Sequence, residues 1–235
     1  MKFLLAAAAL LLAPMAAMAA APVPSPVGTW EVTLAGADQG ISYVTFEEDH
    51  DFTAYGVSAK SFGVFSISGT WEVDDKGLLS AVYEERINGE DVTGSISGKV
   101  TAKSLSGRIS ADNGSFTFKG TPEKTTQDLS GSWTGVAQLG KTRLSEIYQL
   151  QPGDLPHVFN VSGLGISPSN GEFAIAGVAI AGSKGKLRIF VGSTYPGSET
   201  PGLTHLFGTV NAAKTKGALK GFELDGQAIK VSLRR

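Results

Sequence analysis

The sequence predicts an all-β protein made of two tandem antiparallel, up-and-down, eight-stranded barrels. Apolar and polar residues alternate with period two through most of the chain, and the 30 glycines are spaced like turn residues. A Gly-[Thr/Ser]-Trp tripeptide occurs three times and contains all three tryptophans, at Gly28-Thr29-Trp30, Gly69-Thr70-Trp71 and Gly131-Ser132-Trp133. Such repetition indicates an internal duplication, which determines how the rest of the sequence is interpreted.

The first residues have the pattern of an export signal. Lys2 provides a positive charge, and the apolar run from Phe3 to Leu12 is too short to span a bilayer. Ala17-Met18-Ala19 fits the small-x-small cleavage rule. We therefore expect residues 1–19 to be a signal peptide and the mature chain to be exported, to the periplasm or outside the cell. An uncleaved membrane anchor is the alternative, although no transmembrane segment is predicted in the mature chain.

The first predicted domain covers residues 27–121. Trp30, Val32 and Leu34 alternate with Glu31 and Thr33, which is typical of an antiparallel sheet with one buried and one solvated face. The same pattern predicts strands at 29–35, 41–48, 51–58, 64–74, 78–87, 92–100, 102–110 and 114–120.

The second predicted domain covers residues 129–235, after a polar, proline-containing boundary at residues 121–128. Its strands are predicted at 131–138, 142–150, 156–163, 171–180, 185–192, 202–211, 216–223 and 227–234. Eight short strands per unit favour closure, because a closed barrel has no exposed sheet edge. The alternative is a single large β-sandwich or barrel that uses all sixteen strands.

The first half resembles the bacterial lipocalin-like small β-barrels of the calycin type. The resemblance rests on Gly28-Thr29-Trp30, on the hairpin Phe46 to Thr53, and on Gly69-Thr70-Trp71-Glu72-Val73 followed by Asp74-Asp75. It covers residues 27–85 well and 131–160 weakly. His50-Asp51 replaces the glycine turn expected in that hairpin. The resemblance implies a barrel with a cavity for an apolar ligand.

Composition narrows the classes of function. The chain has no cysteine, which excludes disulfides, cysteine-ligated metal centres and thiol nucleophiles. Residues 22–124 carry 15 acidic and 8 basic side chains, net −7, and residues 125–235 carry 7 acidic and 11 basic, net +4. This contrast predicts halves that attract each other or differ in partner. The basic residues are scattered, so nucleic-acid binding is not predicted.

No catalytic set, metal site or cofactor is predicted. The chain lacks a Gly-x-Ser-x-Gly elbow, a phosphate-binding loop and a His-Glu-x-x-His motif. The acidic run Glu47 to Asp51 is interpreted as a solvated hairpin tip, because successive strand residues point to opposite faces and cannot converge on one ion.

Five residues are predicted to bind a ligand, since each places a polar group on a ring within a predicted strand: Tyr43, Tyr55, Tyr83, Tyr148 and His205. The leading hypothesis is a non-catalytic binding protein for a small hydrophobic or amphipathic molecule. One alternative is a cell-envelope module with packed barrels that binds a protein partner. The other is a barrel-type cyclase or isomerase that uses His205 and a tyrosine.

Overall fold

The computed structural model describes residues 24–36, 39–59, 63–87, 90–111, 114–124 and 126–235, and it describes the backbone alone at residues 85–87 and 90–92. The predicted signal peptide, residues 1–19, lies outside the described residues. Within the described ranges, no helix has the length and apolar character needed to cross a bilayer.

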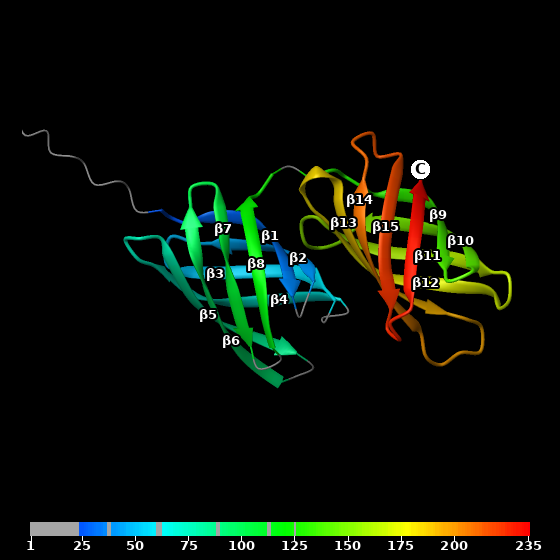
Figure 1. The fold of residues 1–235 in the computed structure, drawn as a ribbon, viewed down its shortest axis with the longest axis horizontal. Helices are drawn as coiled ribbons and strands as arrows, with labels where there is room; N and C mark the ends of the chain where they lie inside the picture. Colours follow the sequence, from blue (N-terminus) through cyan, green and yellow to red (C-terminus); the bar gives the residue numbers. More distant parts are fainter. Residues whose placement is uncertain (1–23, 37–38, 60–62, 88–89, 112–113, 125) are drawn as a thin grey trace, which may run out of the picture.

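Sixteen strands form two closed antiparallel barrels, one from β1–β8 and one from β9–β16 (Figure 1). The strands of the first barrel are β1 (Gly28–Gly36), β2 (Gly40–Phe46), β3 (Asp51–Ser58), β4 (Val64–Val73), β5 (Leu78–Ile87), β6 (Glu90–Thr101), β7 (Ser104–Ala111) and β8 (Gly114–Pro122). Those of the second are β9 (Gly131–Leu139), β10 (Thr142–Pro152), β11 (Val158–Ser167), β12 (Gly171–Ala181), β13 (Lys186–Thr194), β14 (Gly202–Val210), β15 (Lys216–Glu223) and β16 (Ala228–Arg234). A 3₁₀ turn, η1 (Ser183–Gly185), joins β12 to β13.

Every strand pairs with its neighbour in sequence, and each barrel closes on itself. β8 pairs with β1, and β16 pairs with β9. The prediction of two up-and-down eight-stranded barrels is therefore confirmed, and the alternative of one sheet system using all sixteen strands is wrong.

The two barrels begin with the same local structure. Gly28 and Gly131 both adopt a positive φ, 110° and 112°, which requires glycine because a Cβ is disfavoured there. Two residues later the indole N–H of each tryptophan donates to a carbonyl four residues back: Trp30 to Pro26 at 2.6 Å and Trp133 to Leu129 at 2.9 Å. Both rings are buried, so each barrel is closed at this end by an indole whose polar group is satisfied.

Aromatic rings lie over inward-facing glycines in both barrels. In the first barrel the Tyr83 ring covers Gly94 on the adjacent strand. In the second, the Phe173 ring covers Gly165 in the same way. A glycine lets a strand curve around a small barrel, and the ring fills the volume that the missing side chain leaves.

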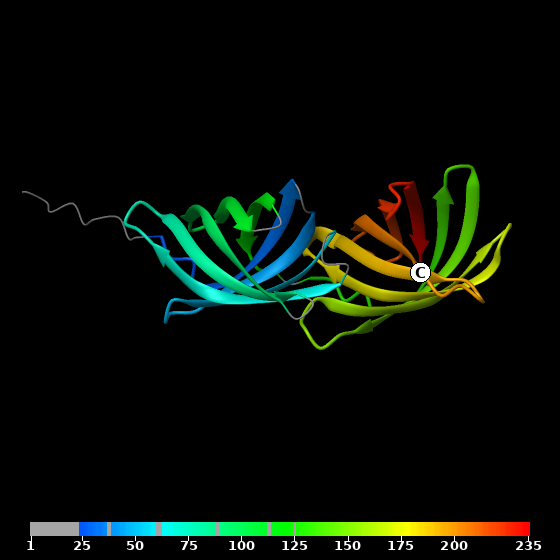
Figure 2. The ribbon, with the colours of Figure 1, turned by 90° about the horizontal axis from the view of Figure 1, so that it is seen from below.

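The two barrels pack side by side through the outer face of the β2–β3 hairpin of the first (Figures 1 and 2). An apolar cluster crosses this junction and contains Ile41, Tyr43 and Val57 from the first barrel, with Val158, Ile180 and Phe190 from the second. Its members are 6% exposed or less. Outward-facing strand positions are thus buried here as fully as a core.

Glu31 on the outer face of β1 makes the charged contact of the junction. Its two carboxylate oxygens accept hydrogen bonds from Lys186 Nζ at 2.8 Å and from the backbone N–H of Ser183 at 2.6 Å. Burial raises the pKa of Glu31, but the bonds from Lys186 and Ser183 outweigh burial and leave the pKa below 4.5. This ion pair agrees in sign with the acidic first half and the basic second half.

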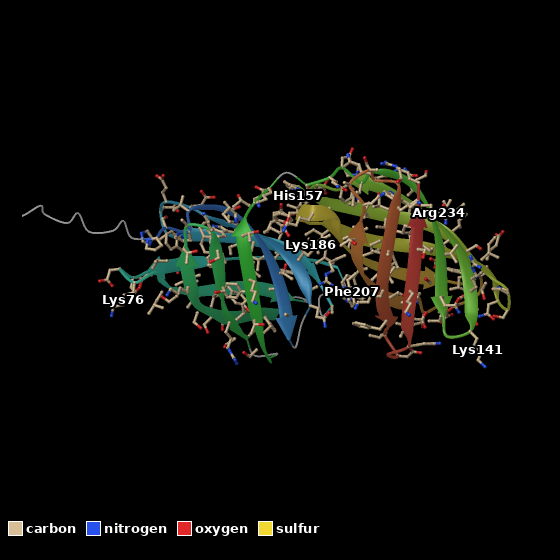
Figure 3. All side chains as sticks on the ribbon, turned by 45° about the horizontal axis from the view of Figure 1, so that its top comes forward. Lys76, Lys141, His157, Lys186, Phe207 and Arg234 are labelled. Carbon is tan, nitrogen blue, oxygen red and sulfur yellow. The ribbon has the colours of Figure 1, made fainter. Side chains whose placement is uncertain are left out.

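His157 binds the segment between the barrels to both of them. Its Nε2 lies 2.5 Å from Glu123 Oε1, its Nδ1 lies 2.6 Å from Thr126 Oγ1, and its ring packs on Tyr43 at 4.3 Å. Lys186 and His157 both lie along the junction in Figure 3.

We predict that Gly165→Ala lowers the free energy of unfolding by about 1–3 kcal/mol, because the new Cβ would overlap the Phe173 ring inside a packed barrel. Urea unfolding measures this. Gly202→Ala is the matched control: a Cβ there meets only Ser193 O at 3.9 Å, and the expected change is small. An equal loss of unfolding free energy in Gly165→Ala and Gly202→Ala would contradict the proposed packing of the Phe173 ring on Gly165.

Candidate functional site

Half-buried apolar side chains pack on the first core at both ends of the barrel: Val44 and Val73 at the end that holds Trp30, and a larger group at the other end. Phe65, Ile67, Ile109 and Ala111 pack against the first core, yet each remains half-buried. β4 and β7 run in opposite directions, so the first residues of β4 and the last residues of β7 lie at the same end of the barrel. We call this end, which carries Phe65, Ile67, Ile109 and Ala111, the Phe65 end. Tyr83 is buried among the same core residues. Solvent therefore reaches large apolar side chains that face into this barrel.

The interior of the second barrel is filled. Its core is one cluster of 21 buried residues, and the inward side chains Leu144, Phe173 and Val191 are 7% exposed or less. Tyr195, in the β13–β14 connection, packs on Phe173 with a centroid separation of 5.0 Å. The two barrels therefore share a topology but differ in how much room they leave inside.

One acidic pair is enclosed in the second barrel. Glu146 faces inward from β10, and its Oε2 accepts a hydrogen bond from Tyr148 OH at 2.5 Å. Gly135 and Gly165 lie opposite Glu146 on the two neighbouring strands. Burial raises the pKa of Glu146, although the Tyr148 hydroxyl partly offsets it. Burial and the same carboxylate raise the pKa of Tyr148, so this pair holds a proton firmly.

Two of the predicted ligand-binding residues lie at the junction. Tyr43 and Tyr55 project from the outer face of the first barrel and stack at 5.8 Å. Tyr43 OH donates to Ala181 O at 2.8 Å, and burial raises its pKa. Burial, with a smaller contribution from Glu123, raises the pKa of Tyr55 to about 12. Both rings hold the two barrels together.

The other three predicted residues are separate from one another. Tyr83 faces the interior of the first barrel, and Tyr148 faces the interior of the second. His205 lies on the outer face of β14, because its neighbour Leu206 belongs to the second core. The five residues therefore do not form one site, and Tyr83 alone adjoins the Phe65 end.

His205 is nevertheless buried, with 2% of its surface exposed. Its ring stacks on Phe190 at 4.3 Å and meets the edge of Phe222 at 5.4 Å. Within the part of the chain that the structure describes, neither ring nitrogen has a hydrogen-bond partner. Burial and the nearby Arg188 charge lower the pKa of His205 to about 4. The imidazole is therefore neutral at neutral pH.

The acidic hairpin tip forms no cluster. Residues Glu47 to Asp51 are exposed, and His50 takes the left-handed conformation with φ of 72° in place of the expected glycine. The His50 ring stacks on Trp71 at 4.8 Å, and its Nδ1 lies 3.1 Å from Trp71 O. Across the residues that the structure describes, no three His, Asp or Glu side chains are grouped to hold a metal ion.

A groove of about 720 Å³ is lined by outward-facing residues of β4–β7 and also by Gly69, Tyr83, Gly94 and Ala111, which occupy inward positions. The strand register explains its shape: Ser68 and Glu84 pair in one outward row, and Thr70 and Val82 pair in the next, with Gly69 between them. Hydroxyl groups of Ser and Thr dominate both rows. The outward rows carry no aromatic ring, and Tyr83 is the aromatic residue in the lining of the groove.

The comparisons with known proteins identify β-barrels. No protein-family model and no curated protein matches the chain. A redesigned β-barrel is similar over 46% of this chain and 90% of its own, at 17% identity and a TM-score of 0.40. A second redesigned barrel, determined with bound DFHBI, matches over 46% and 94% of the two chains, again at 17% identity and a TM-score of 0.40. A protein of unknown function from the DUF3598 family of Nostoc punctiforme matches over 89% and 96%, at 11% identity and a TM-score of 0.28.

These similarities are too low to carry an argument about function. None of the matched structures establishes the lipocalin-like resemblance.

We predict that the free energy of unfolding falls as the pH drops from about 6.5 to about 4, partly because of His205. The folded pKa lies below the ordinary value of 6.5, so the unfolded chain binds the proton first and acid favours unfolding across this window. His205→Phe should remove this part of the pH dependence and retain stability at neutral pH. Denaturant unfolding at several pH values tests it, and identical pH profiles for both proteins would contradict the assignment.

Proposed function

We propose that the protein binds a small hydrophobic or amphipathic molecule inside the first barrel, at the Phe65 end. The observation that supports this is the partial exposure of Phe65, Ile67 and Ile109, three large apolar side chains that face into a closed barrel. On β12, the fourth strand of the second barrel, the inward-facing Phe173 and Ile175 are 3% exposed. Leaving such surface in contact with water costs about 25 cal/mol per Å², and a ligand that covers it recovers that free energy.

The surroundings of these side chains suit an elongated apolar ligand. The opposite end of the barrel is closed by Trp30, Phe46, Phe52 and Trp71, which pack together and are 6% exposed or less. An apolar group that enters from the Phe65 end would therefore meet these four aromatic side chains at the far end of the interior. Tyr83 provides a hydroxyl-bearing ring beside the path, which fits a ligand with one polar group.

The second barrel has a structural role in this proposal. Its filled core gives a rigid body, and the junction cluster fixes the β2–β3 hairpin of the first barrel against it. Among the described residues, six of the eight strands of the first barrel, β1 and β4–β8, contribute nothing to that cluster, and two of these, β4 and β7, carry Phe65, Ile67 and Ile109.

We further propose that the chain is exported and that residues 1–19 are removed. Lys2, the apolar run that follows it and Ala17-Met18-Ala19 support this. N-terminal sequencing of the protein purified from its native host should begin at Ala20. A mature protein that begins at Met1 would reject the proposal.

Ligand binding predicts that Ala111→Trp abolishes binding of the neutral fluorophore N-phenyl-1-naphthylamine, because the indole would occupy the accessible interior. Leu139→Trp is the matched control, since Leu139 is also half-buried and packs on the core of the second barrel. Fluorescence titration should show a saturable enhancement for the unsubstituted protein and Leu139→Trp alone. Binding that survives Ala111→Trp, or no enhancement in any protein, would contradict a ligand in the first barrel.

A further inference from the structure

The outer face of β13–β15 in the second barrel carries a cluster of rings and cations that the ligand-binding proposal does not use. The register places Arg188, Phe207 and Lys220 in one outward row. Phe190, His205 and Phe222 form the next row on the same face. We refer to these six residues as the Phe207 cluster. Figure 3 shows Phe207 beside the junction between the barrels.

Two cations flank one accessible ring in this cluster. The Arg188 guanidinium lies 4.8 Å from the Phe207 centroid, and Lys220 Nζ lies 5.4 Å from it. The Phe207 ring is half-buried and Phe222 is 37% exposed, so part of both rings faces solvent. Ring faces attract cations, which keeps both charges near the aromatic surface.

These charges have no anionic partner among the described residues. The ion pairs there are His157–Glu123 and Lys186–Glu31, and neither includes Arg188 or Lys220. Arg188 Nη1 is buried and lacks a hydrogen-bond acceptor within the same ranges. Arginine presents a planar fork of N–H donors that matches a carboxylate, so an unpaired buried donor of this kind is unusual in a folded protein.

His205 provides a second, independent observation. Only 2% of its surface is exposed, and both of its ring nitrogens lack partners in the described part of the chain. A neutral imidazole has one N–H donor and one acceptor, and buried polar groups of this kind are nearly always hydrogen-bonded. The unpartnered Nη1 of Arg188 and the two unpartnered ring nitrogens of His205 belong to adjacent rows of the same outer face.

We propose that the Phe207 cluster binds an organic carboxylate with a flat apolar body. The body would lie on the Phe207 and Phe222 rings, and the carboxylate would accept hydrogen bonds from Arg188 with Lys220 as the second cation. This ligand supplies an acceptor for the unpartnered Nη1 of Arg188 and negative charge beside two cations. A neutral apolar molecule would cover the rings and leave both cations unpaired.

The test uses benzoate as the probe and the full mature chain. Benzoate titration followed by ¹H–¹⁵N correlation spectra should shift the backbone amides of β13–β15 and the side-chain nitrogens of His205. Arg188→Gln should weaken benzoate binding by about tenfold or more, which corresponds to about 1.4 kcal/mol. Lys220→Gln, at an exposed position, should weaken it severalfold and gives a second variant with little risk to folding.

The controls separate charge from apolar contact. Arg143→Gln removes an exposed cation from the outer face of β10 and should leave benzoate binding unchanged. Benzamide, which has the same ring and no charge, should bind more weakly than benzoate. Unchanged benzoate affinity in both Arg188→Gln and Lys220→Gln, equal affinity for benzoate and benzamide, or shifts confined to the first barrel would each overturn the proposal.

Discussion

Closure of a narrow eight-stranded barrel requires strands to bend where side chains would collide, and this chain meets the requirement by pairing inward glycines with aromatic rings. Tyr83 covers Gly94 in the first barrel, and Phe173 covers Gly165 in the second. Each ring replaces the volume that glycine omits, so curvature is obtained without leaving a void. The distribution of these rings also affects how completely each barrel interior is filled. An inward position with no ring or large aliphatic side chain opposite it remains accessible to solvent.

The two barrels differ in how completely their interiors are filled. In the second barrel large residues such as Leu144, Phe173 and Val191 pack with small inward residues into one buried core, and Tyr195 adds a ring from outside the strands. In the first, the Phe65 end retains accessible apolar surface. Their shared ancestry is visible in the matched positive-φ glycines, Gly28 and Gly131, and in the matched indole hydrogen bonds. The second barrel therefore has the more completely buried core, and the first retains half-buried apolar side chains that face inward.

Much of the fold could be predicted from the sequence because it depends on local patterns. Period-two alternation located the strands, and the tryptophan tripeptides located the start of each barrel. The candidate site was less predictable. Alternation separates two faces of a strand but does not tell whether the outward face meets water or another domain. Tyr43, Tyr55 and His205 were therefore predicted to bind a ligand, whereas their outward face is buried at or near the junction between the barrels.

Two charged residues were missed by the sequence analysis for related reasons. Glu31 looked like an ordinary solvated position in β1, and its partners Ser183 and Lys186 are more than 150 residues away. The inward position of Glu146 could have been predicted from the sequence. Glu146 alternates in step with Leu144, Tyr148 and Leu150, whose side chains face the core. Burial of a carboxylic acid among apolar core residues is unfavourable. An acidic residue at such a position is therefore unusual and can be recognised from the sequence alone.

The junction has a consequence for how the molecule comes apart. Ile41 and Val57 on one side and Ile180 on the other are covered only while both barrels are intact. Loss of either barrel exposes apolar surface on the other, and loss of the second barrel also leaves the Glu31 carboxylate without its amide and ammonium donors. The stability of each barrel therefore includes a contribution from the other, and removal of one repeat leaves an exposed apolar surface on the remaining one.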